Sequence, residues 1–331
     1  MEQPRILLLG AGALGVFFTS KLARAGALTA VAARSDYEAA KEQGYEIDDR
    51  GTVSRFRPGH VIRKAAECPF EPDYILVAAK VLPEIDPARL LAGVPLKPST
   101  AIVLIQNGIG IESRYAELFP SQKILSAVAY LCASRPEPGK VFNTGPGRLE
   151  LGSYPAAAPG PAAERLSELF TAGGAPCTLL ENVQLARWRK LLWNVPFNPL
   201  SVLAGGADTG WLCDGAELEK LCRGLMDEVI DVAASEGFEI TAKEADDMMA
   251  YTRSLAPYNS SMLQDYLAGR PLEVEAILGN PCRIAARNHV AAPKMDACYA
   301  LLKSVDVLRR RAKTTHESRS LQGNPLLFSQ I

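Results

Sequence analysis

Short runs of consecutive apolar residues alternate with amphipathic stretches through the first half of the chain. Apolar runs of about four to eight residues, bounded by turn residues, are typical of strands that are buried on both faces of a sheet. Because helical stretches separate these runs, we expect an α/β domain with a parallel sheet. The predicted strands are Arg5–Leu9, Thr29–Ala33, Tyr74–Ala78, Thr100–Gln106, Ile124–Ala133 and Ala175–Glu181.

The pattern changes from about Glu181 onward, where helical periodicity replaces the strand-like runs. The clearest helix ends at Gly237, a residue type that often terminates helices. Its apolar face is formed by Leu218, Leu221, Leu225, Val229 and Val232. A length of 331 residues exceeds what one core usually reaches. We therefore expect an α/β domain at 1–181 and an all-α domain at 182–331.

The composition excludes several classes of function. Lys and Arg (36) nearly balance Asp and Glu (37), so the charge favours neither nucleic acid nor an anionic membrane as a partner. The seven cysteines form no C-x-x-C pair and the three histidines are scattered, so we expect no metal site. The N-terminal apolar run is too short for a signal peptide and no run could span a bilayer. We expect a reduced, cytoplasmic protein.

The first predicted strand runs directly into the sequence GAGALG, and an apolar-faced helix follows. In this G-x-G-x-x-G spacing, Gly10 permits a tight turn, Gly12 lets a pyrophosphate approach the backbone, and Gly15 allows the helix to pack closely on the strand. With strand, loop and helix all in place, the motif predicts a Rossmann-type dinucleotide site rather than a glycine-rich turn without a ligand. The predicted cofactor-binding loop is Gly10, Ala11, Gly12, Ala13, Leu14 and Gly15.

The second predicted strand ends near Arg34, about twenty residues after the glycine loop, where NAD sites usually carry Asp or Glu. A guanidinium at this position suits the 2′-phosphate of NADP, which it can bind through two charge-assisted hydrogen bonds. We therefore expect NADPH as the cofactor. The alternative is that Arg34 is a solvated loop residue and Asp36 binds the ribose.

Two polar residues follow later strands, at the edge of the sheet where α/β proteins bind ligands. Lys80 comes directly after the strand at Tyr74–Ala78, and Asn107 follows the next strand. Both are predicted to reach the cofactor. The alternatives are a surface charge for Lys80 and ordinary turn chemistry for Asn107.

The stretch KLLWNVPFN, at 190–198, places three polar residues at intervals of four in an apolar context. On a helix, Lys190, Asn194 and Asn198 share one face. Pro196 lacks the N–H group that would bond to the carbonyl of Leu192, so we expect a kink or a loosened turn there. The polar face predicts a helix that opens onto a cleft.

Taken together, these motifs resemble the ketopantoate reductase family. The resemblance rests on GAGALG, on AAK with Lys80, on IQNG with Asn107, on KLLWNVPFN and on SSMLQDYLAGRPLEVEAILG at 260–279. The last of these is the most specific, and together they reach both predicted domains. The family implies NADPH-dependent reduction of 2-dehydropantoate (ketopantoate) to (R)-pantoate, a step of pantothenate and coenzyme A biosynthesis.

The resemblance also implies roles for individual residues. Lys190 would be the catalytic lysine, and an ammonium there can stabilise the developing alkoxide and give it a proton. Glu273 would be its acidic partner; Glu275 lies two residues away and should point elsewhere if this segment is helical. Lys80 would contact the cofactor. Substrate and nicotinamide would be lined by Asn107, Lys190, Asn194, Asn198 and Ser261.

Two departures from the family pattern leave the substrate open. Tyr258 stands where the family often has Asn, and Asn143 stands where His is common. One alternative is therefore a related NADPH-dependent reductase of another 2-keto acid, branched or aromatic. A second is a non-catalytic NADP(H)-binding sensor, which would leave Lys190 and Glu273 without a role. The apolar stripe after Ser261, formed by Met262, Leu263, Tyr266 and Leu267, predicts packing in the core or in a homodimer.

Overall fold

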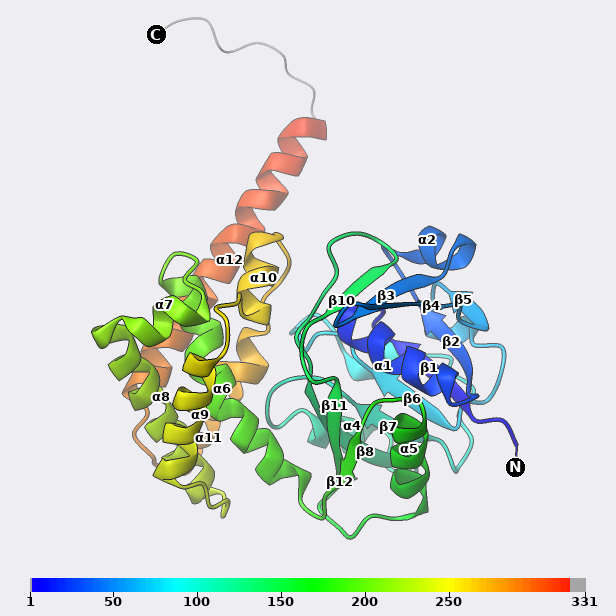
Figure 1. Cartoon of the computed structure of the whole chain (residues 1–331), viewed down its shortest axis with the longest axis horizontal. Coiled ribbons are helices and arrows are strands. Elements are labelled where there is room, and N and C mark those ends of the chain that lie inside the picture. Colours follow the sequence, from blue (N-terminus) through cyan, green and yellow to red (C-terminus); the bar gives the residue numbers. More distant parts are fainter. Residues whose placement is uncertain (1, 322–331) are drawn as a thin grey trace, which may run out of the picture.

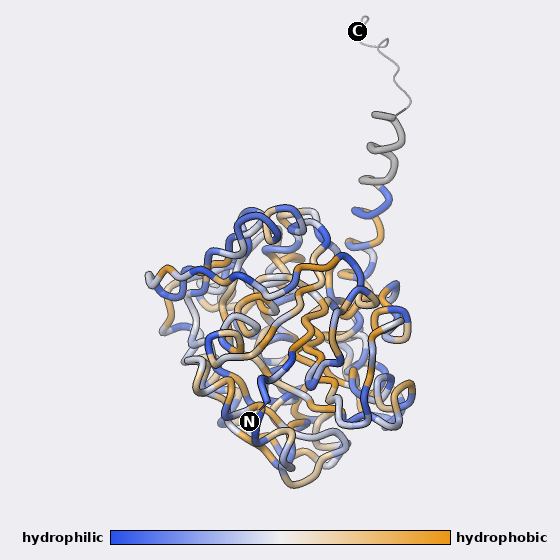
Figure 2. The backbone as a smooth tube through the Cα atoms, turned by 90° about the vertical axis from the view of Figure 1, so that its right-hand side faces the viewer, coloured by the Kyte–Doolittle hydropathy of each residue, from blue (hydrophilic) through white to orange (hydrophobic). Residues whose placement is uncertain are grey.

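The computed structural model describes residues 2–321, with side chains up to residue 312, and has two parts that lie side by side (Figure 1). The first part is a sheet covered by helices, and the second is a bundle of helices. Most of the strongly apolar segments of the tube lie inside the molecule (Figure 2). This arrangement confirms the predicted order of an α/β region followed by an all-α region.

The main sheet has the strand order β12-β11-β8-β7-β6-β1-β2-β5. Six of its strands, from β8 to β5, are parallel, as predicted, whereas β11 pairs with β8 in the antiparallel direction. The central strands β6 and β7 are buried along their whole length, which accounts for their uninterrupted apolar sequence. The strands are β1 (Arg5–Leu9), β2 (Leu28–Ala32), β5 (His60–Ile62), β6 (Tyr74–Val77), β7 (Ala101–Leu104), β8 (Lys123–Tyr130), β11 (Arg148–Tyr154) and β12 (Cys177–Leu179).

A second, four-stranded sheet lies beside the first, in the order β4-β3-β10-β9, and the sequence pattern does not predict it. The strand predicted to reach Ala133 instead ends at Tyr130, because Ala133 belongs to the second sheet and pairs with Asn143. The strands are β3 (Tyr45–Asp49), β4 (Thr52–Phe56), β9 (Ala133–Ser134) and β10 (Lys140–Asn143). The helices of this part are α1 (Ala13–Arg24), α2 (Tyr37–Glu42), η1 (Ala65–Glu67), α3 (Pro87–Leu90), α4 (Glu112–Leu118) and α5 (Pro161–Ala172).

The second part contains helices only, within the described residues. In α8, Leu225, Val229 and Val232 are fully buried, and Gly237 follows the helix with a φ of +81°. No helix in residues 2–321 is both long and apolar enough to cross a membrane. The helices are α6 (Val183–Leu203), α7 (Thr209–Asp214), α8 (Ala216–Ser235), α9 (Ala242–Ser254), α10 (Ser261–Leu267), η2 (Glu275–Gly279), α11 (Asn280–Arg287) and α12 (Pro293–Leu321).

Helix α6 connects the two parts, because it packs against β8 and β11 as well as against α8. It extends without interruption through Pro196 and Pro199, each of which removes one backbone donor. The kink expected at Pro196 stays a prediction. The helix carries Lys190, which bonds to the carbonyl oxygen of Ala129 on β8, and Asn198, which bonds to the first turn of α10.

Candidate active site

The glycine loop has the geometry that a dinucleotide site requires. Gly10 has a φ of +104°, and a Cβ atom there would lie 2.2 Å from the backbone nitrogen of Ala79. A Cβ atom at Gly15 would lie 2.3 Å from the carbonyl oxygen of Gly10. At Gly12, by contrast, a Cβ atom would meet nothing within 4 Å. The loop therefore packs tightly at its ends and leaves open space at its centre, where a pyrophosphate would approach the start of α1.

Arg34 and Asp36, the two candidates for binding the ribose end of the cofactor, have different environments after β2. Asp36 is 1% exposed and accepts hydrogen bonds from Arg135, Ser35 and the backbone N–H of Gly139. Arg34 is exposed. Because the carboxylate of Asp36 is already occupied within the protein, Arg34 is the better placed of the two to meet a ligand.

Arg135 also donates to the carbonyl oxygen of Ala11 and so lies against the glycine loop. The sequence pattern does not single it out, although it directly follows strand β9. Its position after a strand is the same signal that selects Lys80 and Asn107. Arg135 follows the predicted strand at Ile124–Ala133 by two residues, as Lys80 follows the strand at Tyr74–Ala78, so this signal could have found it.

Lys190 and Asn107 meet at the carboxyl end of the sheet. The Nζ atom of Lys190 donates to Oδ1 of Asn107 at 2.9 Å and to the carbonyl oxygen of Ala129 at 2.6 Å. Burial lowers the pKa of Lys190 to about 8, and the nearby charge of Arg187 acts in the same direction. An ammonium with such a pKa can give up a proton near neutral pH.

Glu273 and Glu275 have separate environments, as predicted. Glu273 accepts a hydrogen bond from the backbone N–H of Val81, directly after the strand end that carries Lys80. Burial raises the pKa of Glu273 to about 7. Glu275 instead contacts Arg283 and other side chains of the helical part. Only Glu273 therefore faces the loops at the end of the sheet.

Lys80 spans the two parts of the molecule. Its Nζ atom forms an ion pair with Asp265 at 2.5 Å and donates to the carbonyl oxygen of Pro271 at 2.9 Å. The side chain of Lys80 remains 28% exposed. It therefore lies at the border between the sheet and the helical part, beside the backbone that leads to Glu273.

The two asparagines of α6 are placed differently. Asn194 is 5% exposed, lines a small cavity of about 10 Å³ together with Lys190 and Asn107, and has no partner for its Nδ2 atom. Asn198 is 1% exposed, donates to Asn194, and accepts from Ser261 and from the backbone N–H of Met262. Asn194 thus offers a free donor beside Lys190, whereas Asn198 ties α10 to α6.

The two departures from the family pattern have structural explanations. Tyr258 stacks on Trp193, with ring centroids 5.9 Å apart, and Trp193 stacks in turn on Phe197. Asn143 is buried and bonds to Asp49 and to the backbone of Gly145, which holds the second sheet together. Tyr258 therefore adds an aromatic surface to the helical part, and Asn143 serves the fold.

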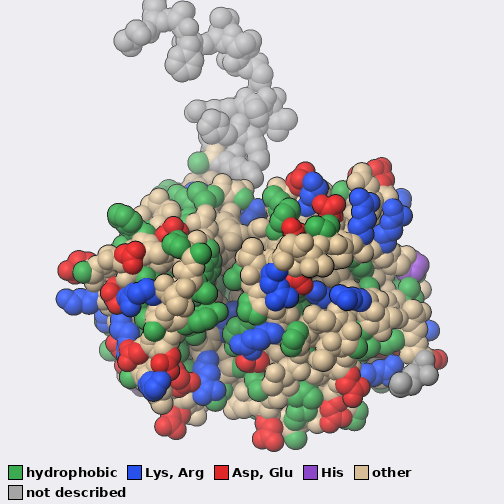
Figure 3. Space-filling model, viewed as in Figure 1, with side chains coloured by type: hydrophobic (Ala, Val, Ile, Leu, Met, Phe, Trp, Pro, Cys, Tyr) green, Lys and Arg blue, Asp and Glu red, His purple; other side chains and the backbone are tan. Residues whose placement is uncertain are grey.

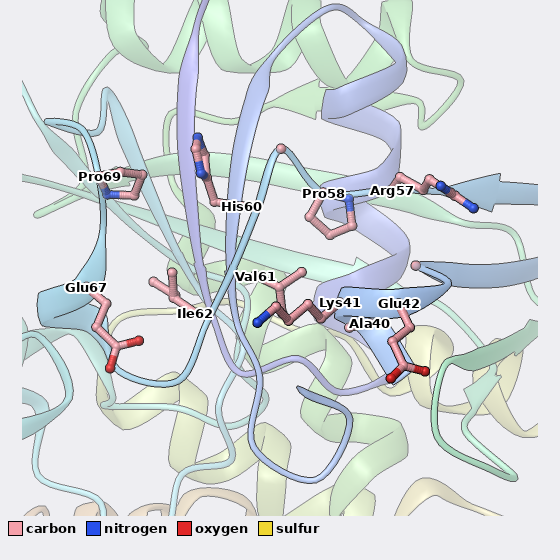
Figure 4. A pocket seen from close by; sticks show the side chains of 12 residues that line it. Ala40, Lys41, Glu42, Arg57, Pro58, His60, Val61, Ile62, Glu67 and Pro69 are labelled. Atoms are coloured by element: carbon pink, nitrogen blue, oxygen red, sulfur yellow. The ribbon is translucent and has the colours of Figure 1, made fainter. Parts of the chain in front are cut away.

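A larger hollow, of about 460 Å³, lies between α2 and β5 (Figure 4). Its lining mixes the basic side chains of Lys41 and Arg57 with the acidic side chains of Glu42 and Glu67. None of the predicted site residues lines this hollow. The candidate active site is instead the region at the carboxyl ends of the strands, where Figure 3 shows a groove between the two parts.

A Rossmann-type glycine loop that shares one sheet edge with a lysine of the following helical part is typical of dinucleotide-dependent oxidoreductases. Comparison with known protein families identifies the family within this class. Residues 6–156 match the family described as "Ketopantoate reductase PanE/ApbA", and residues 182–306 match "Ketopantoate reductase PanE/ApbA C terminal". The chain belongs to the ketopantoate reductase family and is an oxidoreductase.

Individual relatives agree with this assignment. The chain is 32% identical to a 2-dehydropantoate 2-reductase of Nostoc sp., over 96% of this chain and 100% of the relative. It is 38% identical to a crystal structure of 2-dehydropantoate 2-reductase from Methylococcus capsulatus, with a TM-score of 0.84 over 92% of this chain and 97% of that one. A D-mandelate dehydrogenase, solved with NADH and anilino(oxo)acetate, has the same fold at 22% identity, with a TM-score of 0.82 over 92% of this chain and 99% of that one.

Proposed function

We propose that this protein reduces 2-dehydropantoate to (R)-pantoate with NADPH, a step of pantothenate and coenzyme A biosynthesis. The observation that carries the proposal is the environment of Lys190. Its ammonium bonds to Asn107 at the carboxyl edge of the sheet, on the same edge as the glycine loop, and its pKa is lowered to about 8. A proton donor beside a dinucleotide site is what the reduction of a 2-keto acid requires.

In this proposal NADPH, when bound, supplies the hydride. Lys190 holds the keto oxygen through its ammonium and delivers a proton to that oxygen as the alkoxide forms. Asn107 fixes the direction of the ammonium through the 2.9 Å bond to Oδ1. The chain thereby places a positive charge and a transferable proton at one position.

The remaining predicted residues have supporting roles. Glu273 raises the pKa of Lys190 through its negative charge and so favours the protonated donor. The free Nδ2 donor of Asn194 is available to a substrate oxygen. Ser261 is exposed at the start of α10 and can bond to the polar end of the substrate, while Asn198 keeps α10 in place. Lys80 would contact the cofactor.

The substrate assignment is tested by measuring NADPH oxidation with ketopantoate and with a panel of other 2-keto acids, and by repeating the panel with NADH. The highest kcat/KM is expected for ketopantoate with NADPH. The stack of Tyr258 on Trp193 favours an aromatic 2-keto acid as the second candidate. A higher kcat/KM for an aromatic acid would replace ketopantoate as the substrate, and no turnover of any acid would favour a sensor protein.

The cofactor preference depends on Arg34. Replacing Arg34 with alanine is expected to weaken NADPH binding by about 10- to 100-fold, because a charge-assisted pair with the 2′-phosphate is lost. NADH binding should change little, since NADH has no such phosphate. Titration of cofactor fluorescence measures both affinities. Equal losses for the two cofactors would contradict the role of Arg34, and Arg55→Ala, on strand β4, is the control.

The pH dependence of kcat/KM is a further expected result. The reduction needs Lys190 protonated, so the rate should fall as the pH rises through about 8, the pKa of Lys190. Protonation of Glu273 as the pH drops through about 7 removes a charge that raises the pKa of Lys190, but Lys190 stays mostly protonated at such pH, so no acidic limb is expected from this pair. A profile with a single alkaline limb is therefore expected. A rate that still increases above pH 9 would contradict the role of Lys190 as the donor.

We also place the domain boundary at residue 181, between the end of β12 at Leu179 and the start of α6 at Val183. The Rossmann-type NADP-binding domain is then 1–181, and the helical substrate domain is 182–331. We propose that the protein acts in the cytoplasm. We also propose a homodimer, in which Leu267 of α10, which is 64% exposed, packs against the partner.

A further inference from the structure

Arg187 lies one helical turn before Lys190 on α6 and is buried, with a side chain that is 2% exposed. Its Nη1 atom donates to the carbonyl oxygens of Gln106, at 2.8 Å, and Gly108, at 3.0 Å. Its Nη2 atom donates to the carbonyl oxygen of Leu104 at 3.3 Å. One guanidinium thus binds the backbone on both sides of Asn107, the residue that contacts Lys190.

The charge of Arg187 is compensated by Glu112, which is 0% exposed and lies 2.5 Å from Nε. Glu112 also accepts hydrogen bonds from Ser126, at 2.7 Å, and Gln184, at 2.9 Å. Burying two charges costs desolvation free energy, and apolar side chains of similar volume can often stabilise a fold as well. Stability alone therefore does not account for a buried arginine at this position, whereas its directed contacts with one loop do.

The loop that Arg187 binds has left the sheet, since strand β7 ends at Leu104. On its other side the loop lies against the helical domain: the N–H group of Ile109 donates to the carbonyl oxygen of Ala276, and Asn280 donates to Ile109. The backbone around Asn107 is therefore held from two directions, and its side chain is left to face Lys190.

We propose that Arg187 is a positioning residue for the reaction, which fixes the Asn107 loop so that the Asn107 amide holds the Lys190 ammonium. The proposal rests on the proposed function, in which Lys190 is the proton donor. Arg187 and Lys190 are three residues apart on one helix, so a single rigid element carries both the group that fixes the loop and the group that uses it. Arg187 itself touches neither substrate nor cofactor in this account.

Arg187 also affects the charge state of Lys190. The charged and titratable groups that face Lys190 are Arg187 on α6, Glu273 before η2, Cys132 after β8, Glu150 on β11 and Tyr130 on β8, whose ring centroid lies 5.9 Å from Nζ. Burial and Arg187 lower the pKa of Lys190, and Glu273, Cys132 and Glu150 raise it. Removing the charges of Arg187 and Glu112 together should therefore raise the pKa of Lys190 and shift the alkaline limb of the pH profile to higher pH.

Two variants test separately the two effects of Arg187: its contacts with the Asn107 loop and its charge beside Lys190. Arg187→Lys keeps a positive charge beside Glu112, but its single nitrogen atom cannot replace the two Nη atoms that reach the three carbonyl oxygens. We expect kcat to fall by about 10- to 100-fold, the usual effect of a misplaced catalytic group, with the alkaline limb at its wild-type position. The double variant Arg187→Met with Glu112→Gln avoids an unpaired buried carboxylate. We expect a similar fall in kcat and an alkaline limb at higher pH.

The measurements are kcat and KM for ketopantoate, NADPH affinity, thermal unfolding and the pH profile of kcat/KM for the holoenzyme. Arg189→Met is the matched control, because Arg189 lies on the same helix, forms an exposed ion pair with Glu244 and should leave all five unchanged. Folded variants with wild-type kcat and an unmoved alkaline limb would overturn the proposal. Failure of both variants to fold would also overturn it, since Arg187 would then serve the fold. A wild-type profile without an alkaline limb would instead contradict the donor role of Lys190.

Discussion

Lys190→Ala is expected to lower kcat for ketopantoate reduction by about 10²- to 10⁴-fold, the usual contribution of a positioned general acid. The alanine offers no proton to the forming alkoxide and leaves the Oδ1 atom of Asn107 without its 2.9 Å donor. The affinity for NADPH should change by less than about threefold, because the glycine loop and Arg34 are untouched. Steady-state kinetics and cofactor titration measure the two effects separately.

Folding of the Lys190→Ala variant should be little affected. Burial already opposes the charged form of Lys190, as its lowered pKa shows, so the wild-type side chain gains little from its environment. Lys243→Ala is the control, since Lys243 is 78% exposed and forms its ion pair with Asp247 on its own helix. Unchanged turnover in Lys190→Ala would refute the proton-donor assignment. Lost NADPH binding would mean that Lys190 serves the cofactor site.

Gly12→Asp should reduce NADPH affinity by about 100-fold or more, without loss of stability. A side chain at Gly12 meets no protein atom within 4 Å, and the φ of −82° suits any residue. Aspartate is a favourable N-cap, so it should support α1. Its carboxylate would enter the space predicted for the pyrophosphate, and two like charges about 4 Å apart repel by about 4 kcal/mol at the dielectric constant typical of protein surfaces.

Two further variants serve as controls for Gly12→Asp. Gly12→Asn has nearly the same shape and capping ability but no charge, so it should weaken NADPH binding less. Gly15→Ala should have the opposite profile: its Cβ atom would lie 2.3 Å from the carbonyl oxygen of Gly10, and overpacking of this kind costs about 1–3 kcal/mol of stability. Thermal unfolding and cofactor titration measure both properties. Wild-type NADPH affinity in Gly12→Asp would place the pyrophosphate elsewhere.

The second sheet shows where sequence patterns stop being informative. Strand β10 pairs with β3, so Lys140 lies opposite Glu46 although more than ninety residues separate them. Strand β4 is exposed along most of its length, so its residues lack the apolar run that marks a buried strand. The central strands of the main sheet were recognisable because burial on both faces imposes an apolar sequence on each strand separately. Strands β5 and β11 of the same sheet are only partly buried, and the sequence pattern did not predict them.

Asp36 and Glu273 show the same limit within the site. The sequence left Arg34 and Asp36 as alternatives, and the contact of Asp36 with Arg135 favours Arg34. The sequence also indicated that only one of Glu273 and Glu275 faces inward, and the hydrogen bond from Val81 identifies Glu273. In both cases the deciding partner is about a hundred residues or more away along the chain.

The sequence by itself determined the α/β-then-α order, the glycine loop, the shared face of Lys190 and Asn194, and the resemblance to the family. These features depend on the spacing of residues within one helix or strand, so a short stretch of sequence is enough to show them. Only the tertiary structure decided which carboxylate faces the sheet edge, that Asn198 is committed to α10, and that Arg187 binds the loop of Asn107. Those features depend on groups that become neighbours only when the sheet and α6 pack together, because a buried polar group must find its partners wherever the fold brings them.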